Sequence, residues 1–315
     1  MGLANMSVAF VFPGQGSQSV GMMTPFESLP AVRRTFAEAS EVLGTDLWYL
    51  AQEGPAEELN LTANTQPAML TAGIALFRAW RELGGRDPVA VAGHSLGEYT
   101  AWTAAGVLDF AEAVALVRFR GQLMQEAVPA ERGAMAAVLG LDENAVRSVC
   151  TEASSSGVVE AANYNTSEQI VIAGEATAVQ AAVALAKARG AKRAVLIAIS
   201  IPAHCSLMRP AAQRLRERLE TLKLQPPRIM VLNNVDVAAE SAPDRITDAL
   251  VRQLFSPVRW VEIVNALAQA GVTTIVEGGP GVVLAGLAKR IAPQVRSIAV
   301  KDADTLRELA TEFKG

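Results

Sequence analysis

A serine between two glycines stands where this sequence passes from a short apolar run to an amphipathic segment. Gly93, Ser95 and Gly97 form a G-x-S-x-G pattern that follows the apolar run 89–92 and opens the segment 95–105. Glycines leave room for a sharp turn from strand to helix, and the start of a helix stabilises negative charge that develops beside it. The pattern and its context predict a nucleophilic serine for acyl transfer. A serine that only caps a helix in a tight turn is the alternative interpretation.

The hydroxyl of a serine becomes a good nucleophile only when a base takes its proton, and the chain holds only two histidines. His94 immediately precedes Ser95, so its side chain should point away from the hydroxyl and either pack or orient a substrate. His204 lies in the segment 201–206, a predicted loop between an apolar strand and a helix, where functional residues are often found. We therefore predict His204 as the base. A hydrogen-bonded structural histidine is the alternative.

A glycine-rich turn follows the first apolar run of the chain, in the segment 12–18. Open α/β proteins bind their ligands at this end of the sheet. The amide of Leu96, directly after the nucleophile, and an amide of this turn, for which Gln15 is the candidate, are predicted to form an oxyanion hole. A phosphate-binding loop is the rival interpretation, but the turn lacks both the G-x-x-x-x-G-K-[ST] lysine and the G-x-G-x-x-G spacing.

Arg120 lies on the apolar face of a predicted helix. Its neighbours three and four residues away are all apolar: Leu116, Val117, Leu123 and Met124. A guanidinium on such a face must find an anion, because an unpaired buried charge is costly. Two partners fit equally well: an Asp or Glu in a structural ion pair, or the carboxylate of a ligand.

The order of predicted elements places these residues in an α/β fold. Short apolar runs bounded by glycine alternate with amphipathic stretches, which is typical of a parallel sheet covered by helices. In the first and last parts of the chain we expect strands at 8–12, 89–92, 229–232 and 274–277, and helices at 31–43, 66–83, 95–105, 109–126, 208–222, 245–255, 261–270 and after 280.

The middle of the chain has a different order of elements. Strands at 134–139, 158–162, 169–173 and 193–197 and helices at 142–153 and 176–189 give a β-α-β-β-α-β succession. Such a unit buries one face of its sheet under two helices, so it can stand as a small subdomain inserted into a larger one. We predict a large α/β catalytic subdomain, formed by 1–129 and 199–315, and a small subdomain, 130–198.

Composition narrows the class of protein. The 315-residue chain is 50% apolar and carries a net charge of −4, which argues against a nucleic-acid partner bound on a broad basic face. Its two cysteines, Cys150 and Cys205, lack the spacing of a metal site or a disulfide framework. Residues 1–7 lack the basic start of a signal peptide, and no apolar stretch reaches the ~18 residues of a spanning helix. We expect a cytoplasmic protein with no metal and no membrane contact.

Taken together and in this order, the motifs resemble those of bacterial malonyl-CoA:acyl-carrier-protein transacylases. The matching stretches are FPGQGSQ at 12–18, TQPA at 65–68, GHSLGE at 93–98, RG at 120–121, MQ at 124–125, GAM at 133–135, NYN at 163–165, PAH at 202–204 and GPG at 279–281. The resemblance covers nearly the whole chain. It implies an α/β-hydrolase-like large subdomain with an inserted ferredoxin-like small subdomain, in agreement with the order of elements.

The resemblance also implies roles for individual residues. Ser95 would be the nucleophile and His204 its base, and Arg120 would pair with the malonyl carboxylate. The amides of Gln15 and Leu96 would form the oxyanion hole. A backbone carbonyl orients the histidine in this family, and here it would come from Gln253. Four further residues would lie near the substrate: Gln66, His94, Asn163 and Asn165. Ala203 departs from the family, whose members often carry serine or phenylalanine before the histidine, and this bears on acyl selectivity rather than on the chemistry.

The implied partners are malonyl-CoA and acyl carrier protein, bound by a monomer that needs no cofactor beyond the coenzyme A thioester that is its substrate. Two other functions stay open on the residues: a serine esterase or thioesterase, and a non-catalytic carrier-binding protein. The acceptor can also be a polyketide carrier rather than a fatty acid carrier. Because such carriers are acidic, we expect a basic docking patch, although each cluster can equally be a solvated face. The candidates are Lys187, Arg189, Lys192, Arg193, Lys289 and Arg290.

Overall fold

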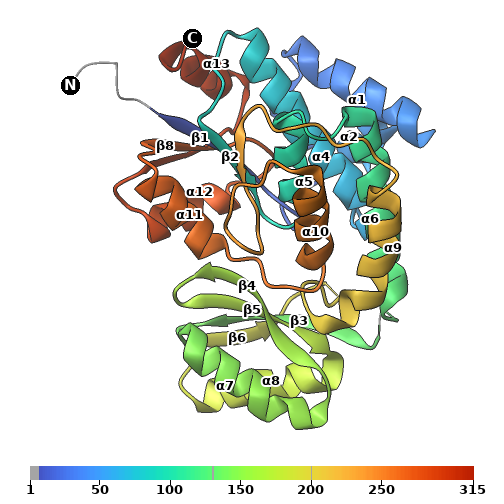
Figure 1. The fold of residues 1–315 in the computed structure, drawn as a ribbon, viewed down its shortest axis with the longest axis vertical. Coiled ribbons are helices and arrows are strands. Elements are labelled where there is room, and N and C mark those ends of the chain that lie inside the picture. Colours follow the sequence, from blue (N-terminus) through green and yellow to red (C-terminus); the bar gives the residue numbers. More distant parts are fainter. Residues whose placement is uncertain (1–6, 130, 200) are drawn as a thin grey trace.

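The computed structural model describes residues 7–129, 131–199 and 201–315. Residues 1–6, in which we expect no signal peptide, lie outside the described residues, as does residue 130, where the predicted small subdomain begins. Two sheets organise the described chain, a parallel one and an antiparallel one (Figure 1). This confirms the predicted α/β class with a larger and a smaller part.

The larger sheet has five parallel strands in the order β7-β2-β1-β8-β9. The strands are β1 (Val8–Phe12), β2 (Ala90–Gly93), β7 (Met230–Leu232), β8 (Thr274–Glu277) and β9 (Arg296–Ala299). The ends of β1 and β2 lie side by side, because Phe12 pairs with Gly93. The glycine-rich turn after β1 and the serine after β2 therefore meet at one edge of the sheet.

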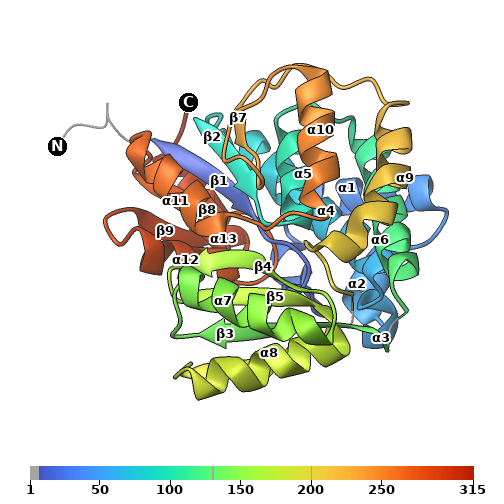
Figure 2. The ribbon, with the colours of Figure 1, turned by 60° about the horizontal axis from the view of Figure 1, so that its bottom comes forward.

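Helices cover both faces of this sheet (Figure 2). The even-numbered side chains of β1 pack into one core with α4 (Thr62–Glu82), while Ala9 and Val11 pack into another with α11 (Trp260–Gln269) and α12 (Val283–Ile291). Burial on both faces explains why β1 is apolar throughout rather than alternating. The other helices of this part are α1 (Pro30–Leu43), α2 (Leu47–Glu53), α3 (Ala56–Leu59), α5 (Leu96–Ala104), α6 (Phe110–Ala127), α9 (Arg209–Leu219), α10 (Pro243–Gln253) and α13 (Ala303–Glu312).

Four of these elements were not predicted from the sequence: α2, α3, α13 and β9. Helices α2 and α3 have only 7 and 4 residues, too few to show a helical period. Strand β9 lies at the edge of the sheet and begins with the exposed Arg296, so it shows no apolar run. Helix α13 did carry a signal, since Asp302 caps its start and buried apolar residues follow at helical spacing.

Helix α4 begins at Thr62, four residues before the predicted start. Pro67 inside the helix removes a backbone donor and makes the preceding turn look non-helical in the sequence. The early start is stabilised from α6, where the side-chain oxygen of Gln125 accepts a hydrogen bond from the amide of Ala63 at 2.7 Å. A tertiary contact of this kind has no local sequence signal.

The smaller sheet has four antiparallel strands in the order β4-β5-β3-β6. Its elements are β3 (Gly133–Leu139), α7 (Glu143–Ala153), β4 (Val159–Thr166), β5 (Gln169–Glu175), α8 (Ala176–Ala188) and β6 (Arg193–Leu196), and both helices pack into one apolar core with the sheet. The predicted β-α-β-β-α-β succession is confirmed. Strand β4 runs four residues beyond its predicted end, so Asn163 and Asn165 lie on this strand. The subdomain boundaries 1–129, 130–198 and 199–315 stay a prediction.

The described ranges, 7–129, 131–199 and 201–315, contain neither a membrane-spanning helix nor a cluster of metal ligands. None of the helices there combines the length and the apolar composition that crossing a membrane requires. Within the same ranges, no three His, Cys, Asp or Glu side chains gather as a metal site. Cys150 and Cys205 are free thiols, and burial raises the pKa of each to about 12.

Candidate active site

Ser95 forms the sharp connection between β2 and α5. Its backbone has φ 53° and ψ −109°, a conformation that residues with a side chain rarely adopt. The strand before it and the helix after it are both buried, so the strained serine is held between two rigid elements. The turn is the nucleophile elbow that the G-x-S-x-G pattern predicts.

Close backbone contacts require glycine on both sides of the elbow. A Cβ on Gly93 would lie 1.9 Å from the carbonyl of Gly97, and one on Gly97 would lie 2.0 Å from the carbonyl oxygen of Phe12. A Cβ on Gly14 would lie 2.5 Å from the carbonyl oxygen of His94. The turn after β1 is therefore pressed against the elbow.

His204 is in hydrogen-bond contact with the serine. The Oγ of Ser95 lies 2.7 Å from Nε2 of His204, and Nδ1 of His204 lies 2.8 Å from the backbone carbonyl oxygen of Gln253. Because that carbonyl can only accept, Nδ1 carries the proton and Nε2 is left to accept one from Ser95. The amide of His204 also donates to the carbonyl of Leu254 at 2.9 Å, which fixes the histidine to the end of α10.

Burial keeps His204 in its neutral form. Only 3% of its surface is exposed. Burial and the nearby charge of Arg120 lower the pKa of His204 to about 3. A neutral imidazole at physiological pH is the protonation state that can take a proton from a serine hydroxyl.

Arg120 points from α6 toward the same serine. Its Nη1 donates to the side-chain oxygen of Gln66 at 2.9 Å, and its Nη2 donates to the side-chain oxygen of Gln253 at 3.0 Å. Nη2 also lies 3.4 Å from Oγ of Ser95, and the guanidinium lies 5.1 Å from the centre of the Tyr99 ring.

The buried guanidinium of Arg120 has no direct counterion. No Asp or Glu oxygen of the described chain lies within 4.0 Å of it. Only 1% of the residue is exposed, and burial lowers its pKa. The structural ion pair considered from the sequence is therefore not formed, and the charge beside Ser95 remains free for an anion that enters the site.

A small pocket of about 70 Å³ joins these groups and is partly open to solvent. Gln15, Leu96 and Asn163 line it together with Ser95 and His204. Its apolar wall is formed by Met124, Met135, Ile199 and Ile201, with Ala203 beside the histidine.

The remaining predicted residues differ in their relation to the pocket. His94 lines it beside Ser95, and Nε2 of His94 lies 2.8 Å from the side-chain oxygen of Asn165 on β4. Asn165 does not line the pocket and contacts it through His94. Gln66 lies behind the cavity and contacts Arg120 instead of lining the wall.

Sequence reasoning missed two residues of the site, Glu98 and Asn234. Both are 0% exposed. The side-chain oxygen of Asn234 accepts from the amide of Ser95 at 2.8 Å, and its nitrogen donates to the carbonyl of Gly93 at 2.7 Å, so Asn234 ties the elbow to the end of β7. Glu98 had a signal, because it is the only charged residue in an otherwise uncharged helix, α5. Asn234 had none in its own segment.

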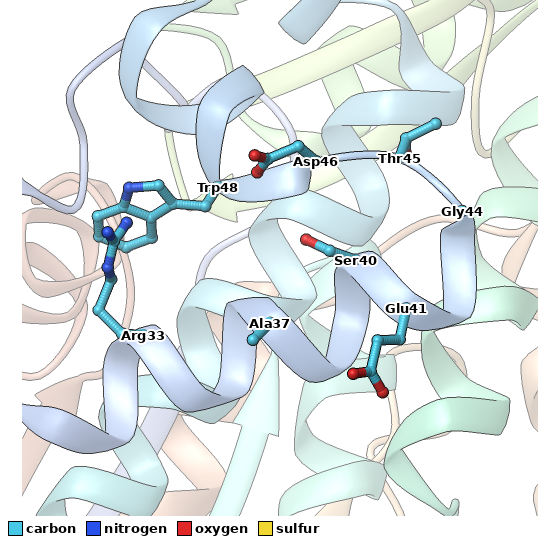
Figure 3. Close-up of a pocket in the computed structure, with 8 residues that line it drawn as sticks. All are labelled: Arg33, Ala37, Ser40, Glu41, Gly44, Thr45, Asp46 and Trp48. Carbon is cyan, nitrogen blue, oxygen red and sulfur yellow. The ribbon is translucent and has the colours of Figure 1, made fainter.

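The structure also shows surface features away from this cavity. An open pocket between α1 and α2 contains none of the predicted site residues, and the guanidinium of Arg33 lies 4.2 Å from the centre of the Trp48 ring there (Figure 3). Two of the basic docking candidates pair with acidic neighbours: Arg189 with Glu152, and Lys192 with Glu168 at 3.2 Å. The patch stays a prediction.

Comparisons with known proteins cover almost the entire chain. The family model described as the acyl transferase domain matches residues 9–303. Malonyl CoA-acyl carrier protein transacylase of Escherichia coli K12 is 52% identical over 299 residues, which span 95% of this chain and 97% of that protein.

Solved structures agree with the sequence comparison. An acyl-carrier-protein S-malonyltransferase of Burkholderia pseudomallei superimposes with a TM-score of 0.95 at 54% identity, covering 97% of this chain and 100% of the other. A malonyl-transacylase in complex with a type II PKS acyl-carrier protein gives a TM-score of 0.95 at 49% identity, with coverage of 97% and 99%.

Proposed function

The chain belongs to the acyl transferase domain family, and we propose that it transfers a malonyl group from malonyl-CoA to the phosphopantetheine thiol of an acyl carrier protein. Ser95 is the nucleophile and His204 the base of this proposal. The amides of Gln15 and Leu96 form the oxyanion hole, and Gln253 orients the base through its carbonyl. Arg120 binds the carboxylate of the malonyl group.

One observation carries the proposal: the hydroxyl of Ser95 touches a neutral base on one side and a cation without a counterion on the other. The oxygen lies 2.7 Å from Nε2 of His204 and 3.4 Å from Nη2 of Arg120. In an esterase for neutral acyl groups, the substrate would bring no anion to pair with a buried guanidinium at that position. An acyl donor that ends in a carboxylate supplies the missing anion.

The reaction follows in two half-reactions. In the first, His204 takes the proton of Ser95, and the serine oxygen attacks the thioester carbon of malonyl-CoA. The oxyanion that forms accepts hydrogen bonds from the two amides at the turn and the elbow. The carbon–sulfur bond then breaks, and the coenzyme A thiol leaves with the proton from His204. The enzyme now holds a malonyl ester on Ser95.

In the second half-reaction the carrier reverses these steps. His204 takes the proton of the phosphopantetheine thiol, the sulfur attacks the ester carbon, and the oxygen of Ser95 leaves with that proton. Substrates supply the acyl group and both thiols, so the proposal requires no cofactor. Free coenzyme A departs before the carrier reacts, which is a ping-pong scheme.

Arg120 discriminates between acyl groups in this proposal. A malonyl group brings an anion into contact with the guanidinium, whereas an acetyl group leaves the buried charge unpaired. Leaving a buried charge without its partner costs about 2–5 kcal/mol. This difference favours malonyl-CoA over acetyl-CoA.

The acceptor is the less defined half of the proposal. A relative at 49% identity is found with a type II PKS acyl-carrier protein, which supports an acyl carrier protein as the partner and keeps both fatty acid and polyketide carriers as candidates. We include in the proposal a monomer that works in the cytoplasm, with the catalytic subdomain 1–129 and 199–315. Rates with one purified carrier of each type would decide between the two acceptors.

The test of the chemistry uses malonyl-CoA without carrier. The intact mass of the protein is recorded beside that of Ser95→Ala. A single malonyl adduct on the wild type, absent from the variant and discharged when carrier is added, is the expected result. Accumulation of free malonate at the rate of acyl transfer would instead favour a hydrolase. Neither adduct nor turnover would leave the non-catalytic carrier-binding function.

A further inference from the structure

Glu98 lies one helical turn after the nucleophile, and the mechanism above assigns it no part. It is fully buried, with 0% of its surface exposed. Three donors converge on its carboxylate. Trp102 Nε1 donates to Oε1 at 3.1 Å, and the amide of Asn234 and Nε2 of Gln253 donate to Oε2 at 3.0 and 2.7 Å. A group surrounded only by donors is best satisfied as a carboxylate, which only accepts.

This carboxylate determines which way the side-chain amide of Gln253 faces. The nitrogen of that amide lies between Oε2 of Glu98 and the carbonyl of Ser95, at 2.7 and 2.9 Å. The oxygen of the amide must then face the opposite side, where it accepts from Nη2 of Arg120 at 3.0 Å. A reversed amide would set a nitrogen against the guanidinium, where two donors repel each other.

Arg120 is held in place by uncharged acceptors. The side-chain oxygens of Gln66 and Gln253 take one bond each from its two terminal nitrogens. Burial lowers the pKa of Arg120, and the negative charge of Glu98, located behind Gln253, partly opposes this shift. The guanidinium thus keeps its full charge on the cavity side while its orientation is fixed from behind.

We propose that Glu98 is a positioning residue for malonyl selectivity, which acts through the side chain of Gln253 to aim Arg120 at the substrate carboxylate. The inference rests on the proposed function, because it concerns the acyl group that Arg120 receives. Glu98 touches neither the substrate nor His204. Its removal should therefore affect acyl groups that carry a carboxylate far more than those that do not.

Protonation of Glu98 gives an independent readout. Burial raises the pKa of Glu98 to about 7, against the opposing effect of its hydrogen bonds and of Arg120 on α6. The other titratable groups of the site are Tyr99 on the same helix and the two histidines, His94 and His204. Burial raises the pKa of Tyr99 to about 12, lowers the pKa of His94 and lowers that of His204 to about 3, so all three are uncharged around neutral pH. A protonated Glu98 presents an O–H to a site that offers only donors, and the orientation of Gln253 is lost.

The experiment compares malonyl-CoA with acetyl-CoA as acyl donors to Ser95. Single-turnover kcat/KM for acylation is measured for the wild type, for Glu98→Gln and for a matched control, Glu277→Gln. Glutamine keeps the shape of Glu98 but offers one acceptor oxygen to three donors and no charge. Glu277 is also 0% exposed and accepts two backbone hydrogen bonds, from Leu284 and Ala285 at the start of α12.

For Glu98→Gln we expect malonyl kcat/KM to fall by roughly 10- to 100-fold, the loss that a misplacement of about 1 Å produces, while acetyl kcat/KM stays within about threefold. Introduced into Arg120→Ala, the same change should have little further effect on malonyl, because the group it positions is gone. Glu277→Gln should leave the ratio of the two donors unchanged. Equal losses for both donors, or a stronger malonyl preference, would overturn the inference.

Two further results keep the test decisive. If Glu98→Gln does not fold, the pH profile of the wild type answers the question: malonyl kcat/KM should decline below about pH 7, while acetyl kcat/KM stays level. A level malonyl profile overturns the inference. If the wild type forms no malonyl adduct at all, the proposed function fails and the inference with it, whereas a normal adduct with an unaltered donor ratio in Glu98→Gln defeats the inference alone.

Discussion

The main chain of Gln253 holds His204, and its side chain does not. The carbonyl oxygen of Gln253 lies 2.8 Å from Nδ1 of His204, whereas its side-chain oxygen lies 3.0 Å from Nη2 of Arg120. One residue at the end of α10 therefore serves both the base and the cation through different atoms. Substitutions at this position can separate the two functions.

Gln253→Ala should weaken malonyl transfer without disabling the base. The carbonyl that orients His204 remains, but Arg120 loses an acceptor. Loss of a hydrogen bond to a charged group costs about 1.5–3 kcal/mol, so we expect malonyl kcat/KM to fall by roughly 10- to 100-fold with little change for acetyl-CoA. Gln66→Ala removes the other amide acceptor of Arg120 and should act in the same direction. Complete loss of the adduct with both donors would show that His204 also depends on the side chain of Gln253.

Arg120→Ala should relax the choice of acyl group. The variant loses the anion site but keeps Ser95 and His204 in contact. Because the unpaired charge that penalises acetyl is worth about 2–5 kcal/mol, the malonyl-to-acetyl ratio of kcat/KM should fall by at least about tenfold. Competition between the two thioesters, followed by intact mass, measures the ratio directly. A ratio equal to that of the wild type would remove Arg120 from substrate recognition.

The sequence predicted the reactive groups better than the framework that orients them. Ser95 and its glycines show a local pattern, because a sharp turn between a buried strand and a helix restricts residue types over five positions. His204 was found by elimination, since the chain has only one other histidine. The hydrogen bond from His204 to Gln253 followed from family resemblance and not from any local pattern.

The polar network behind the site could not be predicted, because its members are brought together only by the fold. Glu98 comes from α5, Asn234 follows β7, and Gln253 ends α10. Within its own segment, Glu98 stands out only as the single charge of its helix, whereas Asn234 is a loop amide and Gln253 a helix terminus. The central strands were predicted because burial on both faces makes them continuously apolar. The edge strand β9 was missed because its exposure removes that signal.

Two buried groups of the site should make opposite contributions to the pH dependence of stability. The pKa of Glu98 is raised from 4.5 to about 7, so Glu98 stabilises the folded protein fully below pH 4.5, and this stabilisation is lost as pH rises through 7. The pKa of His204 is lowered from 6.5 to about 3, so its contribution is present above pH 6.5 and is lost as pH falls toward 3. As pH rises from 4.5 to 6.5, Glu98 lowers the free energy of unfolding while His204 raises it.

Glu98→Gln should remove the contribution of Glu98 to the pH dependence of the free energy of unfolding. Its free energy of unfolding, relative to the wild type, should rise by about 3 kcal/mol between pH 4.5 and pH 7.5, since each pKa unit is worth about 1.4 kcal/mol. Urea unfolding at a series of pH values gives this difference, and groups common to both proteins cancel. His204→Asn should change in the opposite sense over the acidic part of the range. A difference for Glu98→Gln that does not vary with pH would mean that Glu98 ionises in the folded protein as it does in the unfolded chain.

Gly97→Ala should disrupt the elbow, whereas the same substitution in another helix should not. A Cβ at position 97 would lie 2.0 Å from the carbonyl oxygen of Phe12, so β1 and α5 must move apart, and we expect a loss of about 3 kcal/mol or more in the free energy of unfolding. Gly286 in α12 has no atom within 4 Å of such a Cβ. Gly286→Ala should therefore stabilise the protein by about 0.5–1 kcal/mol, the difference in helix propensity. Urea midpoints and the yield of the malonyl adduct test both, and a Gly97→Ala protein with normal stability and normal adduct formation would show that the contact between β1 and α5 is not required to hold Ser95.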